Sequence, residues 1–370
     1  MQSLLKRHEY FPNLNGLRFI GALSIILLHI EDVKKIEHKQ AVWWIRYFNV
    51  DGGHLVSLFF VLSGFLITYL LLKEKSDNNA IDIKKFYVRR ILRIWPLYYL
   101  IGIVGFFVFP LLGVYFYGSY DHNMQNHCWL HFLLYILFLH PFTVSHFIGA
   151  AWSVRVEEAF YLVWPAALNK TKRYVMLFVI VIILTIAVRN FSFLLLHYYH
   201  IRALKIASHL ATDYRFSCMA MGAIAAYIYI QGKLHLLNIL YSKKVQYAVY
   251  MIILLLFLFR VNIPGINFEF YSVFFAIMVL NLATNPQSVL KLNYNWMNYL
   301  GKISYGLYLF NPIMRNLSLE LVMRVFNRDV TGWQANIALY TLTILSTVII
   351  SALSYEFFEK PFLGLKKYFV

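Results

Sequence analysis

The stretch NLNGLRFIGALSIILLHI, residues 13–30, has the apolar content of a membrane-spanning helix, which needs about 20 mostly apolar residues. Two of its side chains are costly in hydrocarbon: Arg18 near one end and His29 near the other. Eleven residues are three helical turns, so both side chains project from nearly the same face, about 16 Å apart along the axis. A snorkelling arginine with a hydrogen-bonded core histidine explains them, and so does a functional site lined by ionisable groups.

The composition extends the membrane reading to the whole chain. Of its 370 residues, 60% are hydrophobic and only 14% are charged, far from the balance of a soluble domain. Apolar stretches recur throughout without a Pro/Gly/Ser-rich linker, which predicts one all-α polytopic helix bundle, a single transmembrane domain over residues 1–370. The formal net charge is +17. Lysine and arginine cluster between the apolar stretches, as topology signals do, so nucleic acid is not expected as a partner.

Charge bias orients the expected spans. We expect about ten, near residues 15–30, 54–72, 90–112, 152–168, 174–195, 214–231, 245–262, 268–284, 303–320 and 336–359. The run 128–140 is interpreted as re-entrant or interfacial, because a span there would move every later basic loop to the other side. Both termini are then cytoplasmic. The outside loop 31–53 mixes basic and acidic residues and fits least well, and no small-residue cleavage site follows the first apolar run, so an uncleaved span is expected.

A second charged group lies in AAWSVRVEEAFYLVWP, residues 150–165, which holds Arg155, Glu157 and Glu158 in an apolar context. This helix should run from outside to inside, opposite to the helix that carries His29. A carboxylate at Glu157 and the imidazole of His29 are therefore expected at one depth, where the carboxylate would orient the ring and raise its basicity. The alternative is an internal pair of Arg155 and Glu158 at helical spacing.

A third group is KKFYVRRILRIWPLYYL, residues 84–100, where Arg89, Arg90 and Arg93 stand near a cytoplasmic helix start. Guanidinium groups at such a place suit the phosphates of a ligand. The same cluster would also satisfy the positive-inside rule and attract anionic lipid head groups.

Other candidate residues indicate less. Cys128 and Cys218 have no metal-site spacing, and His127 and His131 stand four residues apart without an evident acidic partner, so no metal is expected. Ser63 could act as a nucleophile, but small residues also let membrane helices pack closely, and packing is the expectation.

Six ordered motifs resemble the integral-membrane acyltransferase 3 family, whose members O-acylate, mostly O-acetylate, cell-envelope carbohydrates. The motifs are LNGLRFIGALSIILLH, LFFVLSGFLI, FYVRRILRIWPLYYL, WSVRVEEAFYLVWP, LGKISYGLYLFNP and SYEFFEKPF, in chain order and over nearly the whole length. Many family members carry an additional soluble esterase-like domain after the last span. None is expected in this chain, which stops at Val370.

The resemblance implies roles for the residues that match. His29 would be the catalytic histidine with Arg18 as its companion, Arg90 and Arg93 the paired arginines with Arg89 beside them, and Glu157 the motif acid. Glu158, Arg155 and Asn15 are possible supporting residues. Three positions depart from the family pattern: Asn15 where aspartate is frequent, Ala159 where glutamine is frequent, and Asn311 where histidine is frequent. The last puts a catalytic use of the late motif in doubt.

The resemblance also implies an acyl-coenzyme A donor, most often acetyl, at the cytoplasmic face of the cell membrane. The acceptor would be a hydroxyl of a cell-surface carbohydrate or lipid-linked glycan on the far side, with no permanently bound cofactor and with membrane lipids around the bundle. His29 would act as general base or carry the acyl group covalently, and both routes stay open. Two rivals are a transporter with the same buried ions and no bond chemistry, and an acyltransferase that modifies a lipid.

Overall fold

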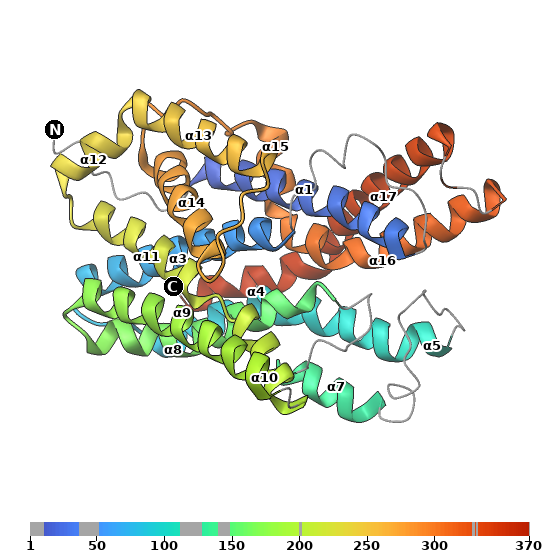
Figure 1. The fold of residues 1–370 in the computed structure, drawn as a ribbon, viewed down its shortest axis with the longest axis horizontal. Helices are drawn as coiled ribbons and strands as arrows, with labels where there is room; N and C mark the ends of the chain where they lie inside the picture. Colours follow the sequence, from blue (N-terminus) through green and yellow to red (C-terminus); the bar gives the residue numbers. More distant parts are fainter. Residues whose placement is uncertain are drawn as a thin grey trace. The chain divides into compact units, whose positions relative to one another are not determined.

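The computed structural model describes residues 11–36, 52–111, 128–139, 149–199, 202–327, 330 and 332–369. Every regular element in these ranges is helical, which confirms the all-α prediction (Figure 1). Two compact units form: unit 1 holds residues 1–21, 48–81 and 156–301, and unit 2 holds residues 22–47, 82–155 and 302–370. The division falls inside two helices, α1 (Pro12–Ile36) and α8 (Ala151–Lys170), so each of these contributes to both units.

The remaining helices belong to one unit each, apart from the last residue of α15. Unit 1 contains α3 (Gly52–Asn78), α9 (Tyr174–Tyr199), α10 (Arg202–Asp213), α11 (Phe216–Ile230), α12 (Leu234–Tyr241), α13 (Lys243–Leu258), α14 (Asn267–Thr284) and α15 (Asn295–Lys302). Unit 2 contains α4 (Ile83–Ile103), the π-helical η2 (Val104–Val108), α5 (Phe109–Leu111), α7 (Cys128–Ile136), α16 (Ser304–Val325), α17 (Trp333–Leu353), the π-helical η3 (Ser354–Glu359), α18 (Lys360–Gly364) and the 3-10 helix η4 (Leu365–Phe369).

Unit 1 is organised around the contact of α3 with α11, which lie side by side (Figure 1). Glycines allow the close approach. A Cβ added at Gly64 would lie 1.9 Å from the Met219 carbonyl oxygen, and one at Gly222 would lie 2.0 Å from the Val61 carbonyl oxygen. No side chain larger than glycine fits either place without moving backbone. The second-span motif therefore serves helix packing, through Gly64.

The first turns of α1 pack against the last turn of α14, the segment that follows it and α15. Asn13 donates to the Leu282 carbonyl (3.1 Å) and accepts from the Leu292 amide (2.9 Å). A Cβ at Gly301 would meet the Asn15 carbonyl oxygen at 2.2 Å. These contacts hold the Arg18 end of α1 within unit 1.

Unit 2 joins α4 to α7 through an aromatic pair. The Tyr98 and Tyr135 rings stack with centroids 4.3 Å apart, and each hydroxyl donates to the other residue's carbonyl oxygen at 3.1 and 2.9 Å. Helix α7 has nine residues, about 14 Å of rise, which is half of the roughly 30 Å hydrocarbon core. The run expected to be re-entrant or interfacial therefore contains a helix too short to span.

Within the described residues, six helical segments are long and apolar enough to cross a membrane, or seven if the bent pair α12–α13 is one span. The number of about ten is thus not confirmed, although each expected range coincides with a helix. Three of those helices are not among the candidate spans, each for a physical reason. Helix α11 has only 15 residues, α8 carries an arginine and two glutamates in its first half, and α16 carries two arginines and a glutamate.

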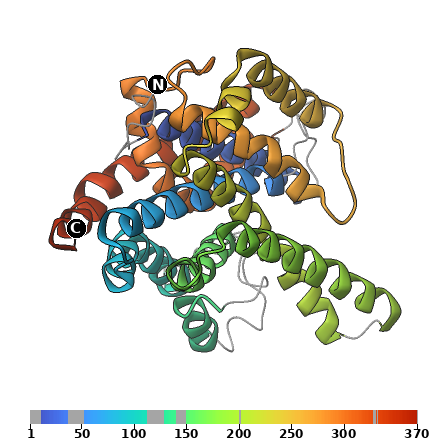
Figure 2. The same cartoon turned by 90° about the vertical axis from the view of Figure 1, so that its left-hand side faces the viewer.

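Helix α10 is an element that the sequence reading did not include. It follows α9 after a short connection, and the two helices lie side by side, drawn in green in Figure 2. Residues 202–213 are too polar to predict a membrane span from their composition.

Candidate functional site

His29 meets Asn311 in unit 2. The His29 Nδ1 atom lies 2.8 Å from Asn311 Nδ2, which joins α1 to α16. Asn311 is fully buried, whereas His29 is half-buried. If the amide nitrogen donates to Nδ1, the neutral ring carries its proton on Nε2; if the amide is turned so that its oxygen accepts from Nδ1–H, Nε2 is free to accept a proton. Asn311 stands where the family often has histidine, and the structure places it in contact with His29, the histidine that the resemblance implies to be catalytic.

Arg315 follows Asn311 by one helical turn and lies on the same side of α16. Its Nε and Nη2 atoms donate to Asn316 Oδ1 at 3.2 and 3.1 Å, and its Nη1 donates to the His29 carbonyl at 3.3 Å. Both Arg315 and Asn316 are buried. The sequence reading passed over this buried guanidinium, although an arginine in an apolar span was a sufficient signal.

A buried ion pair fixes the end of α1 just beyond His29. Lys34 Nζ lies 3.0 Å from Glu31 Oε1 and 2.6 Å from Asn336 Oδ1, and the Tyr340 hydroxyl donates to the same Glu31 oxygen at 2.6 Å. Glu31 and Lys34 are both almost fully buried. The pair ties α1 to α17, so His29 stands on a helix that two neighbours hold.

Glu157 lies in unit 1, where two hydroxyls bind it. Ser63 donates to Oε1 at 2.7 Å and Tyr161 donates to Oε2 at 3.0 Å. Ser63 therefore has a polar partner that the sequence reading did not foresee. The pairing of Glu157 with His29 stays a prediction, because the two residues belong to different units.

The supporting residues take these places. Arg18 lies in the unit 1 part of α1, where its Nη1 donates to Asn15 Oδ1 at 3.4 Å. Arg155 is buried in unit 2, at the last position of α8 before the division, while Glu158 is half-buried in unit 1. The alternative pairing of Arg155 with Glu158 stays a prediction as well.

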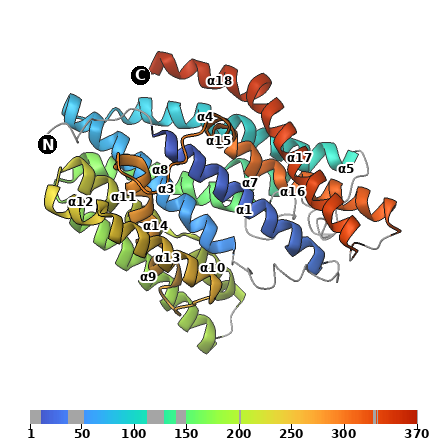
Figure 3. The ribbon, with the colours of Figure 1, turned by 90° about the horizontal axis from the view of Figure 1, so that it is seen from above.

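Helix α4, which carries the three arginines, packs against α18 and η4 of unit 2. Figure 3 shows α4 and α18. Arg89 Nη1 donates to the Phe369 carbonyl at 2.9 Å. Lys366 is half-buried on η4, within electrostatic range of Arg89, Arg90 and Arg93. We call these four side chains the cationic cluster. Its fourth member was not predicted, since nothing in the sequence brings residue 366 to residue 89.

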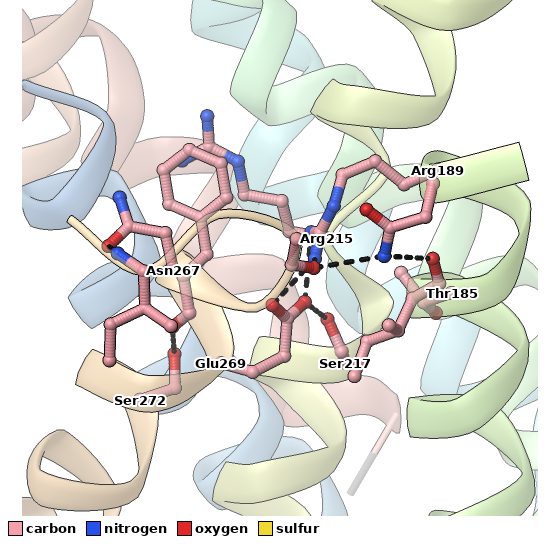
Figure 4. Close-up of polar contacts among 12 residues, drawn as sticks. Thr185, Arg189, Arg215, Ser217, Asn267, Glu269 and Ser272 are labelled. Carbon is pink, nitrogen blue, oxygen red and sulfur yellow. Dashed lines mark hydrogen bonds and ion pairs between the residues drawn. The ribbon is translucent and has the colours of Figure 1, made fainter. Parts of the chain in front are cut away.

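Figure 4 shows a second polar cluster, within unit 1. Arg189 of α9 binds both carboxylate oxygens of Glu269 of α14, at 2.9 and 2.7 Å, and Ser217 of α11 donates to the same carboxylate at 2.5 Å. The Arg215 guanidinium lies 3.5 Å from the centroid of the Phe268 ring and donates to the Gly53 carbonyl at 2.6 Å. The cluster ties four helices together, and the sequence reading missed it.

The described part of the chain contains no group of three His, Cys, Asp or Glu side chains that could hold a metal ion. His131 is half-buried on α7, and His127 lies outside the described residues. Cys128 and Cys218 are both free thiols.

Comparison with known proteins adds the family. Residues 11–356 match the acyltransferase 3 family model, described as an acyltransferase domain. One relative is a Staphylococcus aureus (strain COL) protein that is provisionally named as an O-acetyltransferase. It is 29% identical over 96% of this chain and 58% of its own length. The peptidoglycan O-acetyltransferase OatA of Listeria monocytogenes is 25% identical over 95% of this chain and 56% of its own length. The O-acetyltransferase OatA of Staphylococcus aureus (strain NCTC 8325) is 26% identical over 95% of this chain and 57% of its own length. The chain thus spans little more than half of these relatives. No solved structure matches it.

Proposed function

Because the chain belongs to the acyltransferase 3 family, we propose that it is a membrane O-acetyltransferase that moves an acetyl group from acetyl-coenzyme A to a hydroxyl. The acceptor we propose is a cell-surface polysaccharide or its lipid-linked precursor. Relatives named as O-acetyltransferases, one of them of peptidoglycan, support this class of reaction. The protein would lie in the cell membrane with both termini in the cytoplasm.

The observation that carries the proposal is the placement of His29. A histidine in an apolar helix is held by a buried amide at Nδ1, while its side chain keeps partial exposure. A general base or an acyl carrier needs this division of roles, in which one nitrogen orients the ring and the other reacts.

In the direct route, the Asn311 amide is turned so that its oxygen accepts from His29 Nδ1–H. The unprotonated Nε2 then takes the proton of the acceptor hydroxyl as the hydroxyl oxygen attacks the thioester carbonyl carbon. The carbon–sulfur bond breaks, and the leaving thiolate of coenzyme A receives the proton. The role proposed for Glu157 is to stabilise the imidazolium during this transfer. In the covalent route the acetyl group rests on the imidazole between two such steps.

The proposed donor site is the cationic cluster. Guanidinium groups bind phosphates through paired hydrogen bonds, and coenzyme A carries three phosphates. Arg89, Arg90, Arg93 and Lys366 gather positive charge at one place of unit 2, which supports an anionic ligand there. Anionic lipid head groups share this chemistry.

The test measures acetyl-coenzyme A consumption and acetyl esters together. Membranes with and without the protein are supplied with labelled acetyl-coenzyme A, and label is followed into the polysaccharide, lipid-linked glycan and lipid fractions. Label in either glycan fraction, with release of coenzyme A, is expected. Label only in simple lipids would indicate a lipid acyltransferase, and glycan movement without coenzyme A release would indicate a transporter.

A further inference from the structure

The guanidinium of Arg315 is held by neutral oxygens, although it is buried with 6% of its surface exposed. Its hydrogen bonds go to the Asn316 side-chain oxygen and to the His29 carbonyl. A guanidinium has five N–H donors, and three are used in these contacts, so two are left for a further acceptor. The acid that acts on it electrostatically is Asp32, whose side chain is exposed. A buried cation with neutral partners is costly and marks function.

Asn316 supplies a second, independent observation. Its amide oxygen accepts both hydrogen bonds from Arg315, while its Nδ2 atom is buried without a hydrogen-bond partner. The side chain is 7% exposed. Because Oδ1 and Nδ2 belong to the same amide group, the Nδ2 donor of Asn316 lies beside the Arg315 guanidinium. Buried N–H donors almost always have an acceptor in a native protein. The N–H groups of Asn316 and Arg315 therefore indicate a place where a ligand oxygen binds.

The donors stand next to the candidate catalytic histidine. Asn311 contacts the His29 ring, and Arg315 contacts the His29 backbone. The Arg315 charge also interacts with the imidazole. When His29 takes a proton, two cations therefore face each other. A negative charge that develops beside them at the same moment offsets that repulsion.

We propose that Arg315 and Asn316 bind the carbonyl oxygen of the acyl donor and stabilise the oxyanion that forms on it. This inference rests on the proposed acetyl transfer. As the acceptor oxygen bonds to the carbonyl carbon, the electron pair of the C=O double bond moves to its oxygen, and His29 holds the proton. The Arg315 and Asn316 N–H groups donate to that oxygen. The pair then returns, the carbon–sulfur bond breaks, and the thiolate leaves with the proton from His29.

The experiment separates turnover from donor binding. Asn316→Ala removes one donor, and Arg315→Lys keeps the charge but removes the paired N–H groups. Each should lower kcat about a hundredfold while KM for acetyl-coenzyme A stays within about threefold, because an oxyanion donor acts in the transition state. Arg324→Lys is the matched control, since Arg324 is an exposed arginine of the same helix that pairs with Glu320.

Membrane abundance and thermal stability in detergent are measured for every variant. Unchanged kcat in both Arg315→Lys and Asn316→Ala would overturn the assignment, and so would a rise in KM with kcat unchanged. If the wild-type protein transfers no acetyl group, the proposed function falls and this assignment falls with it. An active wild type with fully active variants overturns the assignment alone.

Discussion

At the scale of single residues, the neutral partner of His29 has a chemical meaning. An asparagine amide orients the imidazole but brings no charge, so it cannot stabilise the imidazolium as a carboxylate would. The charge has to come from another group, and Glu157 is our prediction for it. Its two hydroxyl partners, Ser63 and Tyr161, hold the carboxylate in one orientation.

We expect His29→Ala to abolish acetyl transfer while the protein still inserts, because the substitution removes the base and relieves the burial of a polar ring. His197→Ala is the matched control, since His197 is an exposed histidine near the end of α9. Acetyl esters and membrane abundance are measured together. Transfer within about threefold of wild type at equal abundance would contradict a catalytic role for His29.

We expect Glu157→Gln to lower turnover at least tenfold, about 1.4 kcal/mol of transition-state stabilisation, because the amide keeps the packing but loses the charge. Ser63→Ala should give a smaller loss, since Tyr161 still binds the carboxylate. Glu158→Gln, on a face about 100° away, should do least. Kinetics across pH 5 to 9 compare the three variants, and a larger defect in Glu158→Gln would show that the wrong carboxylate was chosen.

At the scale of helices, two polar contacts show different uses of buried charge. Arg189 and Glu269 form a bidentate ion pair, and Ser217 donates a hydrogen bond to the same carboxylate. Each of the two charges is thus neutralised by the other within unit 1. The cationic cluster of α4 and η4 instead gathers four cations, with the buried Glu359 carboxylate within electrostatic range of Arg93. The first arrangement stabilises the bundle, and the second favours an anionic ligand.

Arg189→Met should destabilise unit 1 by about 3–5 kcal/mol, because it leaves the Glu269 carboxylate buried without its cation. The double variant with Glu269→Leu should recover part of this loss, since neither charge is then unpaired. Unfolding in detergent measures both. The control is Arg324→Met, which breaks an exposed pair that contributes about 0–1 kcal/mol. Equal effects of Arg189→Met and Arg324→Met would show that the buried pair adds no stability.

Lys366→Ala should raise KM for acetyl-coenzyme A more than for a short acetyl thioester that lacks the nucleotide, because an ammonium group contacts phosphates and not the acetyl group. Lys367→Ala is the neighbouring control, since Lys367 is exposed and lies over the Tyr368 ring. Vesicles with and without anionic lipid separate donor binding from lipid binding. An equal rise in KM with both thioesters, or a rise only in anionic vesicles, would refute the role of Lys366 in binding acetyl-coenzyme A.

At the scale of the molecule, periodicity and composition were sufficient to predict the helical class, and the resemblance of six ordered motifs indicated the family. The expected number of spans is not confirmed, because α8 and α11 were both expected to span, but α8 is too charged and α11 too short to count as spans by length and hydropathy. Arg315 could have been predicted as an arginine in an apolar span. Asn311 and Lys366 could not be placed in a site, because their contacts with His29 and with the arginines of α4 join segments far apart in the sequence.

The bond from Arg89 to Phe369 joins residues 280 positions apart. During synthesis, the arginines of α4 are made long before Lys366 of η4. The cationic cluster is therefore incomplete until η4 has been made. A chain that stalls between α17 and η4 has the three arginines but lacks Lys366, so it would offer acetyl-coenzyme A only part of the proposed site. Chains that stop before Leu365 should insert normally and bind the donor weakly, which a ligand-binding assay on truncated protein would show.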